Sequence, residues 1–259
     1  MRASLRILVL TGAALTASAQ DPFEIQIYEY QTVPKGKWNL ETHLNYVGRG
    51  TKTFEGTTAP TNNQFHKTYE LTHGLTDHFE LAGYLVTARR PGGSSLDFVA
   101  WRVRPRMRFP KSWKLPVDIS ISTEVAFPRP TYDENSATLE IRPIIEKAFG
   151  RFQVDLNPVV GRALRGPGTA DGWDFEPGLR LAYAVTDRFK PSLEYYGGTG
   201  PLFDPLPARE QVHLFFPGAD IQVRENVVWN LGIGLAATSA GNHLVYKMRI
   251  GILFGGSGN

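Results

Sequence analysis

The chain has 259 residues, a formal net charge of +3 and no cysteine. The lack of cysteine excludes a disulfide framework, thiolate metal sites and a lipid on an N-terminal cysteine. No stretch after residue 19 approaches 18 consecutive apolar residues, which excludes a helical membrane protein.

The first 19 residues have the pattern of a secretory signal peptide. Arg2 and Arg6 form a basic start, residues 7–15 form an apolar run, and Ala17 and Ala19 are small residues suited to cleavage. The apolar run is too short to span a bilayer as a helix. We therefore predict cleavage after Ala19 and a charge of +1 for the remainder, which gives no reason to expect nucleic acid as a partner.

Residues 20–37 contain one short β-like stretch, at 25–30. Because sustained alternation begins only after them, we expect these residues to form a periplasmic lead-in to the folded domain.

Strict alternation of apolar and polar residues starts at Trp38 and runs to Val47. A tilted transmembrane strand needs about ten residues, whereas soluble strands are usually about five or six residues long. The same alternation recurs along the chain, with weaker versions between the clear ones. The clear segments are 117–127, 138–146, 152–158, 175–183 and 244–254, and the weaker ones lie near 64–72, 79–88, 98–109, 189–197, 211–223 and 227–237.

These segments predict an all-β fold, a transmembrane antiparallel up-and-down β-barrel of about twelve strands over residues 38–254, with a C-terminal tail at 255–259. The register of 211–223 stays open, because His213, Phe215 and Phe216 fit either face.

The connections between the predicted strands alternate in length. Long connections rich in glycine, proline and asparagine would face outward, and most of the others are short turns that would face the periplasm. Long loops on one side and short turns on the other are typical of outer-membrane barrels, so we predict export to the outer membrane.

Several short motifs resemble a known family. Residues 33–41, 74–81 and 175–178, together with a closing strand that ends at Phe254, resemble the outer-membrane barrel family named after the meta-cleavage pathway of phenol degradation, often labelled as transporters. The resemblance implies a barrel and the passage of small organic compounds, and it offers no catalytic residues. The terminal Phe254 resembles the C-terminal aromatic residue used in barrel assembly, so it implies the barrel assembly machinery as a partner besides outer-membrane lipid.

The predicted inward faces carry the candidate pore-lining residues. Arg102, Arg104, Arg106 and Arg108 occupy successive inward positions of one strand, with acids on the neighbouring strands at Glu80, Asp118 and Glu124. The other inward candidates are Glu41, His43, His66, Glu70, Glu140, Arg142, Asp155, Lys247 and Arg249. The arginines could orient anionic solutes, or cross-strand ion pairs could brace the lumen. Nearly equal numbers of acids and bases favour the brace.

Enzyme motifs are missing from the sequence. It has no HExxH motif and no serine placed beside a histidine on a predicted strand. His43 and His66 fall near Glu41 and Glu70, which suggests a metal site, but we favour neutral polar lumen residues. We therefore expect no catalytic residues, no metal and no cofactor.

We interpret the chain as a passive or weakly selective channel for small organic solutes, with aromatic and anionic compounds as candidate classes. The alternative is a plugged, non-conducting barrel with a structural or surface-binding role through its outer loops.

Overall fold

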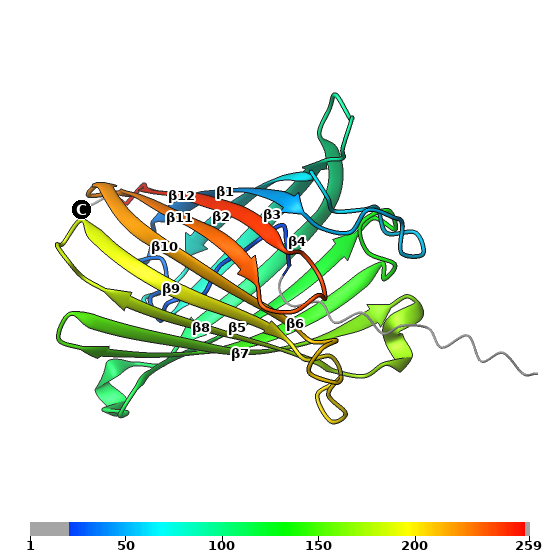
Figure 1. Ribbon diagram of the computed structural model, residues 1–259. Coiled ribbons are helices and arrows are strands. Elements are labelled where there is room, and N and C mark those ends of the chain that lie inside the picture. The colour runs from blue at the N-terminus through cyan, green and yellow to red at the C-terminus, as the bar shows by residue number, and fades with distance from the viewer. Residues whose placement is uncertain (1–20, 257–259) are drawn as a thin grey trace, which may run out of the picture.

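The computed structural model describes residues 21–256 (Figure 1). Twelve strands form one closed barrel in which each strand pairs antiparallel with its neighbours in sequence and β1 pairs with β12. The prediction of an all-β, twelve-stranded barrel is confirmed. The predicted signal peptide, residues 1–19, lies outside the described residues.

The strands are ten to fourteen residues long, which is enough to cross a membrane when tilted. They are β1 (Trp38–Arg49), β2 (Phe65–Gly74), β3 (Phe79–Arg89), β4 (Asp97–Arg108), β5 (Asp118–Pro128), β6 (Ala137–Phe149), β7 (Phe152–Arg165), β8 (Asp174–Tyr183), β9 (Phe189–Gly198), β10 (Val212–Arg224), β11 (Val227–Ala236) and β12 (Leu244–Phe254). Two short 3-10 helices, η1 (Lys111–Trp113) and η2 (Pro167–Ala170), lie in connections. Neither helix in the described part of the chain has the length and apolar character needed to span a membrane.

The two faces of each strand differ as the two-residue period requires. In β3, Ala82, Tyr84 and Val86 are buried in the barrel, whereas Leu81 and Leu85 are exposed on its outside. In β10 the open register is resolved: Leu214 and Phe216 point inward and Phe215 points outward. The outer surface is therefore an apolar belt suited to lipid.

Proline residues interrupt the ladders without ending the strands. No pairing links β4 to β5 at Arg104 and Pro105, and none links β6 to β7 around Pro143 and Pro158. Proline has no N–H to donate to a ladder, which explains the gaps.

The inside of the barrel holds residues 21–33, which we name the luminal segment (blue in Figure 1). Its backbone is extended, and its side chains Ile25, Ile27, Tyr28 and Tyr30 are buried. The expectation of a lead-in outside the barrel is therefore wrong for these residues. The segment starts near the end of the barrel with the long loops, where Phe23 meets Tyr132, and it leaves at the end with the short turns.

A tight reversal joins the luminal segment to β1. The N–H of Gly36 donates to Gly74 at 2.8 Å, and the N–H of Lys37 donates to Pro34 at 3.0 Å. Gly36 has a φ of +75°, a conformation that favours glycine. A Cβ at Gly74 would lie 2.2 Å from the carbonyl oxygen of Pro34, so only glycine fits this crossing point. The last residue of β12, Phe254, pairs with the first residue of β1, Trp38. Recognition of Phe254 by the barrel assembly machinery stays a prediction.

Candidate functional site

The lumen is the candidate site, and the arginine ladder of β4 runs along its wall. Arg102, Arg104 and Arg106 are buried, and Arg108 lies at the rim near the short turns. Inward placement of all four follows from the two-residue period of the strand.

Each ladder arginine has oxygen partners. Arg104 contacts Glu70 at 2.5 Å and Glu80 at 3.1 Å, and Arg106 contacts Glu80 at 2.8 Å. Arg102 contacts Glu124 at 3.1 Å.

Two further partners of Arg102, Asp21 and Glu24, come from the luminal segment. Arg108 donates to the carbonyl of Asp77 at 2.7 Å and to the side chain of Gln31 at 2.6 Å. One expected partner does not reach the ladder, because Asp118 pairs with Lys111 at 3.0 Å in the connection before β5. Carboxylates of β2, β3, β5 and the luminal segment therefore neutralise Arg102, Arg104 and Arg106, whereas Arg108 has neutral oxygen partners.

The remaining charged candidates are also paired. Arg142 contacts Glu140 at 2.8 Å, and Arg249 contacts Glu41 at 2.5 Å. Two further pairs include residues that were not among the candidates. These are Lys247 with Glu194 at 2.5 Å and Asp155 with Arg180 at 2.8 Å, where Arg180 also contacts Asp220 and Glu29. Apart from Arg142 and Glu140, which both belong to β6, these ion pairs join different strands or join a strand to the luminal segment.

Many inward side chains serve the backbone of the luminal segment. Asn157 accepts a hydrogen bond from the N–H of Tyr28 at 2.7 Å and donates to the carbonyl of the same residue at 3.1 Å. The N–H of Val33 donates to Glu80 at 2.5 Å, and that of Tyr30 donates to Glu146 at 2.8 Å. Carbonyls of the segment accept from Asn45, Thr68, Arg106, Arg142 and Lys247. Since a buried backbone without partners is costly, these contacts explain how an irregular segment is stable inside a barrel.

The two candidate histidines have different surroundings. His66 is buried between Pro22 and Gln64, whose oxygens lie 2.8 Å and 2.6 Å from its two ring nitrogens. His43 instead points its Nε2 toward Glu70. The two histidines therefore do not form a joint site.

One group in the part of the chain that the structure describes has the composition and spacing of a metal site. It consists of Glu24, His43 and Glu70, all buried. Sequence reasoning did not include Glu24, Asp21 or Glu29, because it placed the luminal segment outside the barrel. The one sequence feature that indicated burial of this segment was the apolar alternation at 25–30, which is not expected in a solvent-exposed linker.

A cavity of about 380 Å³ lies beside the luminal segment at the end with the short turns. Its lining includes Gln26 and Glu29 of the segment, Arg106 and Arg249 of the wall, and turn residues such as Glu225. The cavity shows that the segment does not fill this half of the lumen.

Comparison with known proteins supports the fold. No family model and no curated protein matches the chain. Among solved structures, the COG4313 outer membrane channel from Pseudomonas putida F1 is 13% identical, with 89% of this chain and 100% of that one covered and a TM-score of 0.54. The KdgM porin is 9% identical (84% and 99% covered, TM-score 0.52), and the NanC porin is 8% identical (84% and 99% covered, TM-score 0.53). The chain therefore has the outer-membrane β-barrel fold that these channels and porins share.

Proposed function

We propose that this protein is a narrow, weakly selective outer-membrane channel for small organic solutes, which pass beside the luminal segment. The observation that carries the proposal is the cavity of about 380 Å³ between the segment and the wall, which opens at the turn end of a closed barrel. A cavity of this size is at the lower end of those that hold small organic ligands.

The charges around the cavity favour uncharged solutes over anions. The two ladder arginines that line the cavity, Arg104 and Arg106, are each paired with a carboxylate, so neither is left to bind a solute carboxylate there. The charged lining residues comprise seven acids and five bases, namely Glu29, Glu41, Glu70, Glu80, Asp187, Asp220 and Glu225 against Arg104, Arg106, Arg188, Lys190 and Arg249. We therefore propose small neutral compounds, aromatic ones included, and a slight preference for cations among ions.

A second candidate function rests on the luminal segment itself. Its backbone is hydrogen-bonded to the wall from Pro22 to Val33. A segment held at so many points could close the lumen, which would leave a structural or surface-binding role for the barrel.

Planar-bilayer recording of the refolded protein separates these two functions. The channel proposal expects small, steady conductance from the full chain, a reversal potential shifted slightly toward cations in a salt gradient, and several-fold larger conductance from a variant lacking residues 21–33. A silent full chain beside a conducting deletion variant would establish the plugged barrel instead. Clear anion preference in the full chain would contradict the charge argument.

A further inference from the structure

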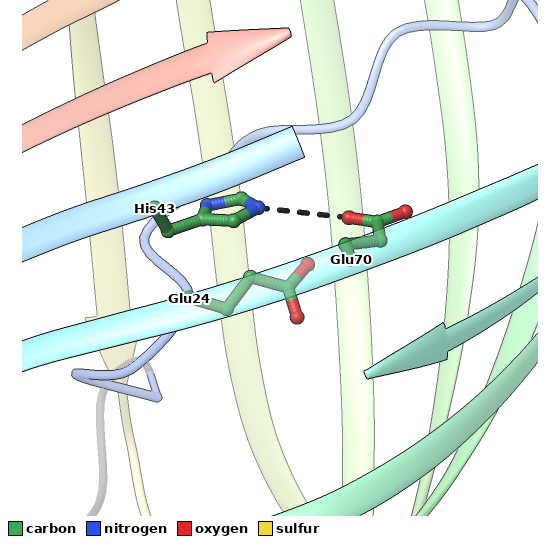
Figure 2. Close-up of side chains that lie close together, drawn as sticks. All are labelled: Glu24, His43 and Glu70. Carbon is green, nitrogen blue, oxygen red and sulfur yellow. Dashed lines mark ion pairs between the residues drawn. The ribbon is translucent and has the colours of Figure 1, made fainter. Parts of the chain in front are cut away.

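Three buried side chains from separate parts of the chain converge inside the barrel (Figure 2). Glu24 belongs to the luminal segment, His43 to β1 and Glu70 to β2. Each is at most 3% exposed, and one donor atom from each lies within 4.8 Å of the other two.

The spacing between His43 and Glu70 is that of two ligands of one ion. The Nε2 atom of His43 lies 3.6 Å from Oε2 of Glu70, which is beyond the length of a normal hydrogen bond. Both atoms are buried and have no hydrogen-bond partner. Bonds of about 2.0–2.2 Å from zinc to nitrogen and oxygen place two ligand atoms roughly 3–4 Å apart.

The carboxylates are already oriented by their other oxygens. Oε1 of Glu70 accepts from Arg104 at 2.5 Å and from Thr72 at 2.8 Å, so Oε2 is directed at His43. Oε1 of Glu24 accepts from the hydroxyl of Tyr28. Outer contacts of this kind fix the ligand oxygens of metal sites before the ion binds.

The charge balance around the three residues favours a divalent cation. The ion pairs around the three residues form separate groups, which together contain six carboxylates and four arginines and so leave two negative charges in excess; the carboxylates are Asp21, Glu24, Glu41, Glu70, Glu80 and Glu124. Neighbouring Arg142 and Lys247 are each paired with a carboxylate outside this set. Two uncompensated charges in a buried site are costly unless a cation or protons neutralise them.

We propose that Glu24, His43 and Glu70 bind a divalent transition-metal ion of the zinc type, which ties the luminal segment to the barrel wall. One imidazole nitrogen with carboxylate oxygens suits zinc, whereas calcium and magnesium prefer oxygen ligands alone. Oε2 of Glu41, 3.7 Å from Nε2 of His43, is the nearest further carboxylate oxygen to that nitrogen. This site does not depend on whether the barrel conducts.

Zinc uptake by the full chain, refolded in detergent and stripped with chelator, tests the proposal. Equilibrium dialysis against zinc chloride should give one tightly held ion per barrel, and zinc should raise the unfolding temperature seen by heat-modifiable gel migration. His43→Gln and Glu70→Gln should each lower zinc affinity at least about ten-fold, since even outer-contact residues of metal sites matter that much. His66→Gln is the matched control, a buried histidine on the adjacent strand, and should keep the ion.

A second pair of variants tests the tie between segment and wall. Glu24→Gln and the deletion of residues 21–33 change no residue of the barrel wall. Both should lower zinc affinity about as much as His43→Gln does. These two variants also decide the matter if the wall variants fail to fold. The proposal is overturned if the full chain takes up no zinc, if uptake survives in Glu24→Gln and in the deletion variant, or if calcium is held more tightly than zinc.

Discussion

Asn157 holds Tyr28 by both sides of its backbone, with its amide oxygen 2.7 Å from the N–H and its amide nitrogen 3.1 Å from the carbonyl oxygen. The side chain thereby gives the luminal segment, midway along the barrel, what a neighbouring strand would give it in a sheet. The inward residues of the barrel wall are thus specific for the luminal segment, as the outward residues are for lipid.

Replacing Asn157 by alanine should loosen the luminal segment. Two buried backbone groups of Tyr28 would lose their partner, at a cost of about 1–3 kcal/mol each if they stay buried. The variant should be cleaved faster by protease within residues 21–33 while the barrel stays intact on a gel. Asn226→Ala, at an exposed turn where the side chain donates to Leu253, should leave cleavage as in the parent chain. Equal cleavage of the two variants would show that Asn157 is not a holding point.

Removing the hydroxyl of Tyr28 isolates its hydrogen bonds from its packing. That hydroxyl donates to Glu24 and lies 3.0 Å from the hydroxyl of Tyr84. Tyr28→Phe should therefore lower the free energy of unfolding by about 1–2 kcal/mol, whereas Tyr28→Ala should lower it by about 3–5 kcal/mol through the cavity it leaves. Urea titration in detergent measures both. Tyr46→Phe is the control, because the hydroxyl of Tyr46 is exposed and water can take over its hydrogen bond to Asn63. An equal loss of unfolding free energy in Tyr46→Phe and Tyr28→Phe would contradict the prediction.

Neutralising the centre of the ladder should destabilise the barrel more than it changes ion preference. In Arg104→Gln with Arg106→Gln, the buried carboxylates of Glu70 and Glu80 lose their arginine partners. Breaking a buried ion pair in this way costs about 3–5 kcal/mol. Arg90→Gln breaks an exposed pair with Asp97 and should cost less than about 1 kcal/mol.

The measurements for the ladder are the urea midpoint and the reversal potential. A midpoint close to that of Arg90→Gln, together with loss of a strong anion preference, would mean that the arginines face the solute rather than brace the wall.

A charged residue introduced on the outer face at mid-strand should destabilise the barrel. Leu193 lies at the middle of β9 beside Leu181 and is 46% exposed on the outside of the barrel. Leu193→Arg should lower the free energy of unfolding in lipid vesicles by roughly 2–4 kcal/mol, because arginine near the bilayer centre is poorly solvated. Leu96→Arg is a matched change at an equally exposed residue of a long connection and should be neutral. Similar losses at both sites would mean that the β9 surface is not in contact with lipid.

The barrel could be predicted from the sequence because its strands obey one local rule. Residues two apart face the same medium, so the alternation from Trp38 to Val47 already shows which side meets lipid, and the same rule leads to Phe254 at the other end.

The contents of the lumen could not be predicted in this way. Ile25 and Ile27 alternate with polar residues like a strand, but their partners are side chains and apolar clusters from several strands rather than one ladder. No spacing in the sequence records such contacts. Asp21 and Glu24, which complete the partners of Arg102, were missed for the same reason.

The interior course of the luminal segment sets an order for assembly. The carbonyl of Ile25 accepts a hydrogen bond from Lys247, a residue 222 positions later in the chain. The N–H of Tyr28 donates to the side chain of Asn157, 129 positions later. Contacts this distant along a chain form slowly. The first described residues of the protein are thus among the last to reach their final contacts, and they must already be inside, or enter through an open mouth, when β1 and β12 close the seam.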